Sequence, residues 1–218
     1  SMMAPKSKVK NRFPDNFIST DSGCDILKTA VIVGENAGGK SNFVRSLGYL
    51  RSFFQENKKV KSYGNVININ NIKKGCLKDC NTLQMFDMEI WLDYIGFYHY
   101  HLEIDFIGIV KEQLEYKEKQ KQKYKQILFV SRGESKFDCD GKEEECAGNN
   151  LCKLSGVVSY QISFSGIDPE KEDAFEDAVN SQKQMGLFVT RLAILGYVHA
   201  IDFVEWMTDY LCPETNEI

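Results

Sequence analysis

The sequence lacks the features that would place the protein in a membrane. A membrane-spanning helix needs about 20 mostly apolar residues in a row. The most apolar stretch of this chain, residues 186–198, is shorter than that and contains Thr190 and Arg191. Residues 1–3 show no charged region followed by an apolar one, so we expect no targeting signal. These absences predict a protein that does not contact a membrane.

The cysteines lack the pairing that marks disulfide frameworks and zinc sites. The chain has seven of them, an odd number, and no secretory signal precedes them. This predicts free thiols in a reducing cytoplasm. The spacings Cys76-x3-Cys80 and Cys139-x6-Cys146-x5-Cys152 contain none of the C-x2-C pairs of common zinc sites. We therefore expect no structural metal at these cysteines.

The composition is that of one folded domain. Hydrophobic residues make up 43% and charged residues 27% of the 218 residues, which predicts a packed core. The net charge of -4 offers no overall basic surface for nucleic acid. The densest basic stretch, 117–125, alternates lysine with other residues, and we expect it to be a solvated hairpin tip or helix face.

The chain contains, near its start, the pattern of a strand, a glycine-rich loop and a helix. Residues 29–33 (TAVIV) form a short, β-branched, almost wholly apolar run, which is typical of a strand buried on both faces. The loop at 34–41 follows directly. After it, apolar residues recur on one face of a helix: Phe43, Val44, Leu47, Leu50, Phe53 and Phe54. Residues 27–54 therefore predict the order strand, loop, helix.

The loop satisfies the phosphate-binding pattern G-x4-G-K-[ST], with Gly34, Gly39, Lys40 and Ser41 at the defined positions. Glycines let backbone N–H groups approach phosphate oxygens, and the helix that follows adds the positive end of its dipole. The pattern assigns the Lys40 ammonium to the β- and γ-phosphates and the Ser41 hydroxyl to Mg²⁺. A chance glycine-rich turn is the alternative, but the flanking strand and helix favour a nucleotide site. We expect ATP with Mg²⁺.

From residue 83 the apolar period changes to two, which predicts an antiparallel β arm over 83–165. Within it we expect one hairpin over 83–106 and a further strand at 158–164. The Lys, Glu and Gln content of residues 111–126 favours a helix, but Leu114 and Tyr116 alternate, so we prefer a second hairpin over 111–130. His99 and His101 share the polar face of the first hairpin, at a spacing that suits a metal pair. No further ligands are placed beside them, so solvent-facing histidines are the preferred interpretation.

The last part of the chain, 168–212, predicts helices. Asp168 is an expected N-cap, with Pro169 at the first helical position. Apolar residues then recur at helical spacing from Leu187 to Leu211. The expected fold class is thus α/β with α+β character.

The loop and its flanks resemble a family of ATPases. GENAGGKSN at 34–42 resembles the G-x-N-G-x-G-K-S-N loop of ABC-type ATPases that are not transporters, the SMC, RecF and OLD-like group. The segments 14–18 (PDNFI) and 27–54 are more similar still to AAA-family ATPases of bacterial abortive-infection (phage-defence) systems. The resemblance covers most of the chain, and only the loop is highly specific. It implies a P-loop NTPase fold, namely the N-terminal lobe of an ABC-type ATPase.

The resemblance also implies a set of nucleotide-binding residues. They are Gly34, Glu35, Asn36, Ala37, Gly38, Gly39, Lys40, Ser41 and Asn42, with Ser41 as the Mg²⁺ ligand. Gln182 and Gln184 are candidates for the glutamine that senses the γ-phosphate in this group, with a polar linker as the alternative.

Other parts of a complete ATPase of this group are not found. No apolar run ends in the Asp-Glu pair that such enzymes use for hydrolysis, and Leu154-Ser155-Gly156 matches only a fragment of the ABC signature. We therefore expect a lobe that lacks its catalytic C-terminal half and binds ATP without completing hydrolysis alone. The implied partner is a second ATPase half or another copy of the chain, with DNA or an effector protein downstream by analogy.

Three other functions compete with this one. A GTPase would account for the D-x-x-G string at 105–108, but the string falls in a hairpin connection and no Asn-Lys-x-Asp guanine reader exists. A small-molecule kinase needs a lid with arginines, and the five arginines form no such cluster: Arg12, Arg45, Arg51, Arg132 and Arg191. An interaction domain with a vestigial loop is the third alternative.

Overall fold

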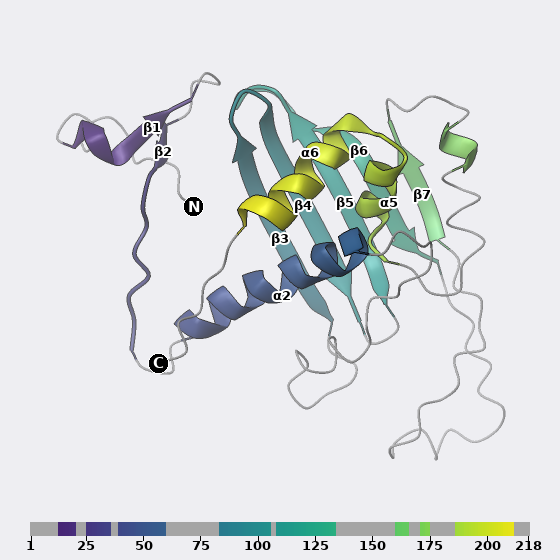
Figure 1. Ribbon diagram of the computed structural model, residues 1–218, viewed down its shortest axis with the longest axis horizontal. Helices are drawn as coiled ribbons and strands as arrows, with labels where there is room; N and C mark the ends of the chain where they lie inside the picture. The colour runs from purple at the N-terminus through teal and green to yellow at the C-terminus, as the bar shows by residue number, and fades with distance from the viewer. Residues whose placement is uncertain are drawn as a thin grey trace, which may run out of the picture.

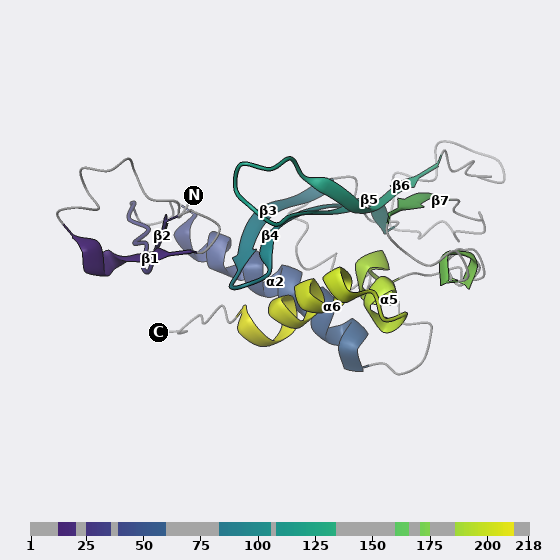
Figure 2. The ribbon, with the colours of Figure 1, turned by 90° about the horizontal axis from the view of Figure 1, so that it is seen from above.

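The computed structural model describes residues 13–20, 25–35, 39–59, 83–105, 108–133, 160–165, 171–174 and 186–211. Over these residues the protein is a mixed α/β structure built on a five-stranded antiparallel sheet (Figure 1). The longer helices lie against one face of the sheet, which we call the inner face (Figure 2). This confirms the expected combination of an antiparallel β arm and C-terminal helices.

The sheet is a simple meander, because each strand pairs with its neighbour in sequence in the order β3-β4-β5-β6-β7. Its strands are β3 (Gln84–Leu92), β4 (Gly96–Ile104), β5 (Ile109–Lys117), β6 (Lys125–Arg132) and β7 (Tyr160–Phe164). Both predicted hairpins and the further strand are confirmed. Lys119, Lys121 and Lys123 of the lysine-rich stretch lie in the β5–β6 connection and are exposed, as expected for a hairpin tip, whereas Lys117 at the end of β5 is buried, contrary to expectation.

The β3–β4 turn requires a glycine at its end. Gly96 has a φ of 142°, and a Cβ at this position would lie only 2.6 Å from the carbonyl oxygen of Lys117. The Tyr116 hydroxyl donates a hydrogen bond to the carbonyl of Ile95 at 2.8 Å. The first hairpin is therefore closed tightly onto the end of β5.

Three helices cover the inner face: α2 (Lys40–Lys59), α5 (Phe188–Ile194) and α6 (Val198–Glu205), which continues into the π-helical turn η2 (Trp206–Tyr210). The predicted helix after the glycine loop is thus confirmed. The remaining elements are the 3-10 helix η1 (Pro14–Asn16) and the strands β1 (Phe17–Ser19) and β2 (Asp25–Leu27), which pair with each other. Asp168 and Pro169, the expected helix start, lie outside the described residues. No described helix is long and apolar enough to cross a membrane.

The core is aromatic where α2, α6 and β4 meet. The ring of Phe54 packs edge-on against Tyr100 and Phe203, with both centroid separations 5.8 Å, and the rings of Tyr100 and Phe203 are 4.8 Å apart. All three side chains are fully buried. Burying a side chain of this kind contributes about 1.5–3 kcal/mol. Arg51 of α2 also donates a hydrogen bond to the carbonyl of Thr208 at 2.9 Å, which joins α2 to η2.

One carboxylate is enclosed in this core. Glu112 of β5 is 0% exposed, and it accepts hydrogen bonds from the backbone N–H groups of Phe188 at 2.7 Å and Val189 at 3.2 Å. These N–H groups belong to the first turn of α5, where no intrahelical acceptor exists. The Tyr100 hydroxyl donates a third hydrogen bond at 3.0 Å. Burial raises the pKa of Glu112 to about 7, although the three hydrogen bonds act to lower it.

The predicted strand at 29–33 is not formed. These residues have no regular secondary structure, and the side chains of Val31, Ile32 and Val33 are 79%, 54% and 84% exposed. A strand buried on both faces needs neighbouring strands and covering layers. Among the described strands, β1 and β2 pair only with each other and the larger sheet ends at β3 and β7. The prediction was wrong because the run has no partner strand there.

We expect Glu112→Ala to lower the free energy of unfolding by about 3 kcal/mol, because two buried N–H groups lose their acceptor. Tyr100→Phe is the matched control: it removes one donor and leaves both backbone bonds to Glu112, so its expected cost is about 1 kcal/mol. Urea unfolding measures both values. Equal losses in the two variants would contradict the role of Glu112 in starting α5.

Glu112 also makes stability depend on pH. Its pKa of about 7 in the folded protein exceeds the ordinary value of 4.5, so the folded state binds the proton more tightly than the unfolded state. The free energy of unfolding that this residue contributes therefore falls as the pH rises from 4.5 to 7. We expect the wild type to lose stability over this interval relative to Glu112→Gln, which does not titrate. A constant difference between the two proteins would argue against the raised pKa.

Candidate functional site

The predicted phosphate-binding loop leads directly into α2. The structure describes Gly34 and Glu35 at its start and Gly39 at its end, whereas residues 36–38 lie outside the described part. Gly39 has a φ of 83°, which glycine adopts without steric cost. Its carbonyl accepts the first helical hydrogen bond, from the N–H of Phe43 at 3.0 Å. The loop and helix thus follow each other as the pattern predicts.

Lys40 is the first residue of α2, and its side chain reaches back over the loop. The ammonium donates hydrogen bonds to the carbonyl oxygens of Gly34 at 2.7 Å and Glu35 at 2.6 Å. It therefore joins the two ends of the loop and places a positive charge between them. An ammonium has three N–H donors. Within the described part of the chain these two bonds leave a third donor for an anion.

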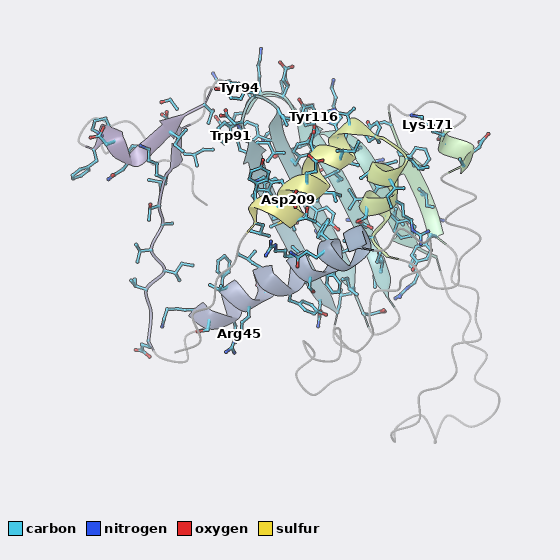
Figure 3. The ribbon with its side chains drawn as sticks, viewed as in Figure 1. Arg45, Trp91, Tyr94, Tyr116, Lys171 and Asp209 are labelled. Carbon is cyan, nitrogen blue, oxygen red and sulfur yellow. The ribbon has the colours of Figure 1, made fainter. Side chains whose placement is uncertain are left out.

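The start of α2 has the electrostatics of an anion site. The helix is 20 residues long and has no acidic residue in its first turn. Aligned peptide dipoles place roughly half a positive charge at such an end, and the first N–H groups have no helical acceptor. Ser41 and Asn42 are exposed there. Arg45 projects from α2 away from the sheet (Figure 3). These donors suit a phosphate chain, and the Ser41 hydroxyl is a suitable oxygen ligand for Mg²⁺.

Apolar side chains flank the loop and are uncovered. Val31, Ile32 and Val33 precede it, and Phe43, one turn into α2, is 52% exposed. No described residue covers this region. Gln182 and Gln184 lie outside the described residues, so their role at the γ-phosphate stays a prediction.

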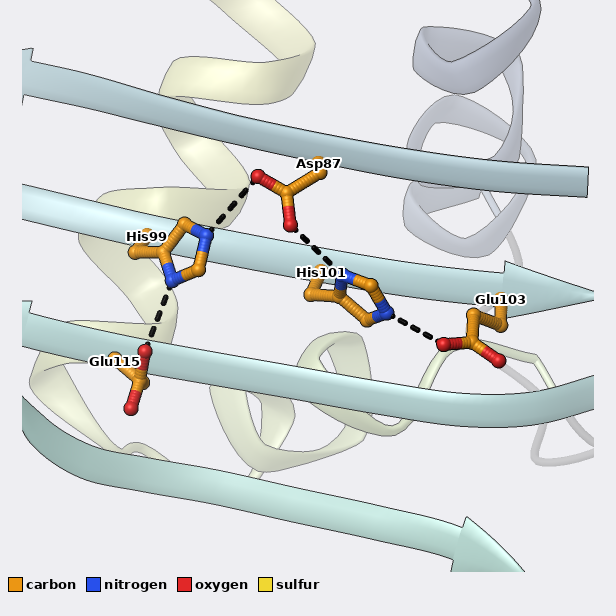
Figure 4. Close-up of polar contacts among 5 residues, drawn as sticks. All are labelled: Asp87, His99, His101, Glu103 and Glu115. Carbon is orange, nitrogen blue, oxygen red and sulfur yellow. Dashed lines mark hydrogen bonds and ion pairs between the residues drawn. The ribbon is translucent and has the colours of Figure 1, made fainter.

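A second polar group, on β3, β4 and β5, was only partly anticipated (Figure 4). His99 and His101 do share one face of β4, but their side chains are only 28% and 13% exposed. Each ring nitrogen faces a carboxylate oxygen of Asp87, Glu103 or Glu115. No group of three His, Cys, Asp or Glu side chains in the described chain is arranged to hold a metal ion. The two histidines lie on the polar face of β4, as expected, but they are partly shielded and their partners are carboxylates that the sequence analysis did not place beside them.

The two ends of the D-x-x-G string, Asp105 and Gly108, are hydrogen-bonded to each other, and residues 106–107 between them lie outside the described part. Asp105 accepts hydrogen bonds from the backbone N–H of Gly108 at 3.1 Å and from Arg132 Nη1 at 2.9 Å. It closes the β4–β5 connection and fastens it to β6. Both the aspartate and the arginine are engaged within the fold, which agrees with the position in a hairpin connection expected from the sequence.

Sequence reasoning missed Glu112 and the carboxylates around the histidines. A signal for Glu112 was present, because it has the same phase along β5 as Leu114 and Tyr116, which face the helices. The carboxylates become visible only from the strand register, which places Asp87 opposite His101 and Glu115 opposite His99.

Comparisons with known protein families, with curated proteins and with solved structures found no match to this chain.

We expect Ile32→Asp to change the free energy of unfolding by less than about 0.5 kcal/mol, because this side chain lies outside the core. Ile104→Asp is the matched control in β4, where the same change places a carboxylate at a fully buried position. It should cost more than about 3 kcal/mol. Thermal or urea unfolding distinguishes the two. A large loss in Ile32→Asp would show that 29–33 is a buried strand after all.

Proposed function

We propose that this chain is the ATP- and Mg²⁺-binding lobe of an ABC-type ATPase with a P-loop NTPase fold. The observation that carries the proposal is Lys40, whose ammonium lies across a glycine-rich loop at the N-terminus of a long helix. An ammonium, the first N–H groups of a helix and a hydroxyl within three consecutive residues form a donor set for a triphosphate.

The proposed roles follow from the chemistry of these side chains. The Lys40 ammonium offsets charge on the β- and γ-phosphates, and the backbone N–H groups of the loop donate to phosphate oxygens. Ser41 and a bound triphosphate would hold Mg²⁺, which shields the phosphate charge when present. Asn42 lies beside them in the first turn of α2.

The surroundings of the loop support the need for a partner. Residues 29–33 have the composition of a buried strand, yet the described chain gives them no neighbouring strand. We infer that a second ATPase half or another copy of the chain supplies the missing strands and the catalytic acid. ATP binding would then control this association, and any DNA or effector protein would act downstream of it. A role in abortive infection or phage defence rests on the sequence resemblance.

The structure gives the alternatives little support. A GTPase would need Asp105 at the nucleotide, but it is bonded to Arg132 and Gly108. A kinase lid would need available arginines, and Arg51 and Arg132 are engaged in the fold. A vestigial loop would not bind nucleotide, and the titration of ATP described next tests for this.

Calorimetric titration of ATP, with and without Mg²⁺, tests the proposal on the full chain. We expect Mg²⁺-dependent binding that falls by more than about tenfold in Lys40→Ala, because the charge facing the phosphates is lost. Ser41→Ala should chiefly reduce the effect of Mg²⁺. Lys28→Ala, an exposed lysine shortly before the loop, is the matched control and should bind like the wild type.

Equal affinities in Lys40→Ala and the wild type would refute the site. Absence of binding in the wild type, with the fold intact, would favour the vestigial interaction domain. ATP turnover by this chain that depends on Lys40 would contradict the inference that catalysis needs a partner.

A further inference from the structure

The outer face of the sheet, opposite the helices, carries a network of charged residues that the proposed function does not use. Its members are His99 and His101 of β4, Asp87 of β3, Glu115 of β5, and Glu103 of β4 (Figure 4). No described element covers this face (Figure 2). The network spans three neighbouring strands, and one of them, β3, is an edge strand of the sheet.

Asp87 is the centre of the network. One of its carboxylate oxygens lies 3.1 Å from Nε2 of His99, and the other lies 2.8 Å from Nδ1 of His101. The remaining nitrogens have their own acceptors. Nδ1 of His99 is 2.9 Å from a Glu115 oxygen, and Nε2 of His101 is 2.7 Å from a Glu103 oxygen. All four separations are hydrogen-bond distances.

These four contacts determine the number of protons in the network. Ionised carboxylates only accept hydrogen bonds, and a neutral imidazole has one N–H donor and one acceptor nitrogen. Two neutral histidines would therefore supply two donors for four contacts and would turn two lone pairs toward carboxylate oxygens. Only doubly protonated imidazoles satisfy every contact.

The other charged groups on this face do not supply the positive charge that the two doubly protonated imidazoles carry. Glu89 of β3 is paired with Lys117 of β5 at 3.3 Å, and the Lys117 ammonium also lies over the rings of Phe97 and Tyr124. Lys111 stands opposite Glu103, with its ammonium over the ring of Phe129. The ring of Tyr124 lies 5.7 Å from that of His99. Loss of both imidazolium charges would thus leave three neighbouring carboxylates.

We propose that this network, which we call the lock, stabilises the pairing of the edge strand β3 with β4 and β5 while both imidazoles are doubly protonated. When the imidazoles lose these protons, the hydrogen bonds to Asp87 are lost and β3 is held less tightly to β4. The inner face of β3 stays packed against the helices, so the change is local to the edge of the sheet.

The pH interval of the lock follows from the direction of two shifts. Hydrogen bonds to Glu115 and Asp87 raise the pKa of His99 above its ordinary 6.5 in spite of burial, so its contribution is complete below 6.5 and is lost as the pH rises through the raised value. The hydrogen bond from His101 lowers the pKa of Asp87 below its ordinary 3.8, so that contribution is complete above 3.8 and is lost toward lower pH. The lock is therefore strongest between about pH 4 and 6.5.

Nuclear magnetic resonance of the full chain tests the lock, since the chain has only three histidines. At pH 6 we expect protons on both ring nitrogens of His99, whose pKa is raised. His199, whose pKa is lowered by burial, should lose its proton at a lower pH than His99. Between pH 6 and 9, exchange protection of the β3 amides, corrected for the intrinsic rate, should fall by about tenfold, while protection in β6 changes less.

Asp87→Asn separates the lock from general pH effects. It removes the shared acceptor, so His99 should titrate at lower pH and the pH dependence of β3 protection should disappear. Asp93→Asn, in the β3–β4 turn and outside the network, is the matched control and should behave as the wild type. Single protonation of His99 at pH 6, or β3 protection that is constant while His99 titrates, would overturn the proposal. Unchanged pH dependence in Asp87→Asn would do the same.

Discussion

The arrangement of sheet and helices depends on the carboxylate of Glu112. The sheet is a meander of consecutive strands, so its pairing is local in sequence. The helices α5 and α6 come from a distant part of the chain and pack mainly through apolar contacts, which are not directional. A buried carboxylate is different, because it is stable only when hydrogen-bonded. The N–H groups of Phe188 and Val189 satisfy it, and this contact determines where α5 begins and how it faces β5.

The same residue shows why the fold could be predicted from the sequence only in part. The hairpins and α2 were predictable because alternation with period two and a helical apolar face are local patterns. Glu112 belongs to a strand segment in which most residues are charged or polar, KEQLEYK, and an acid in such a segment is normally expected to face water. Its phase with Leu114 and Tyr116 indicates the inner face, but its acceptor role depends on N–H groups 76 residues away.

The prediction of a strand at residues 29–33 was wrong for a different reason. Their β-branched composition describes a strand that fits between two others, whereas strand formation also needs partners, which composition does not supply. The motif beside them did predict local geometry: Gly39 takes the left-handed conformation, Lys40 opens the helix, and its ammonium lies over the loop. The ligand of the motif stays a prediction. Of the residues expected to bind it, 36–38, 182 and 184 lie outside the described part.

The candidate nucleotide site and the lock depend on different kinds of contact. The helix that carries Lys40 and Ser41 is anchored to the inner face by Leu50, Phe53 and Phe54, whose side chains do not titrate. The outer face carries histidine–carboxylate contacts at β3. Rising pH weakens the contributions of both Glu112 and His99, so these two contributions are larger at mildly acidic pH than at neutral pH. The contacts of Lys40 at the loop are of another kind, because its acceptors are the backbone carbonyls of Gly34 and Glu35, which do not titrate.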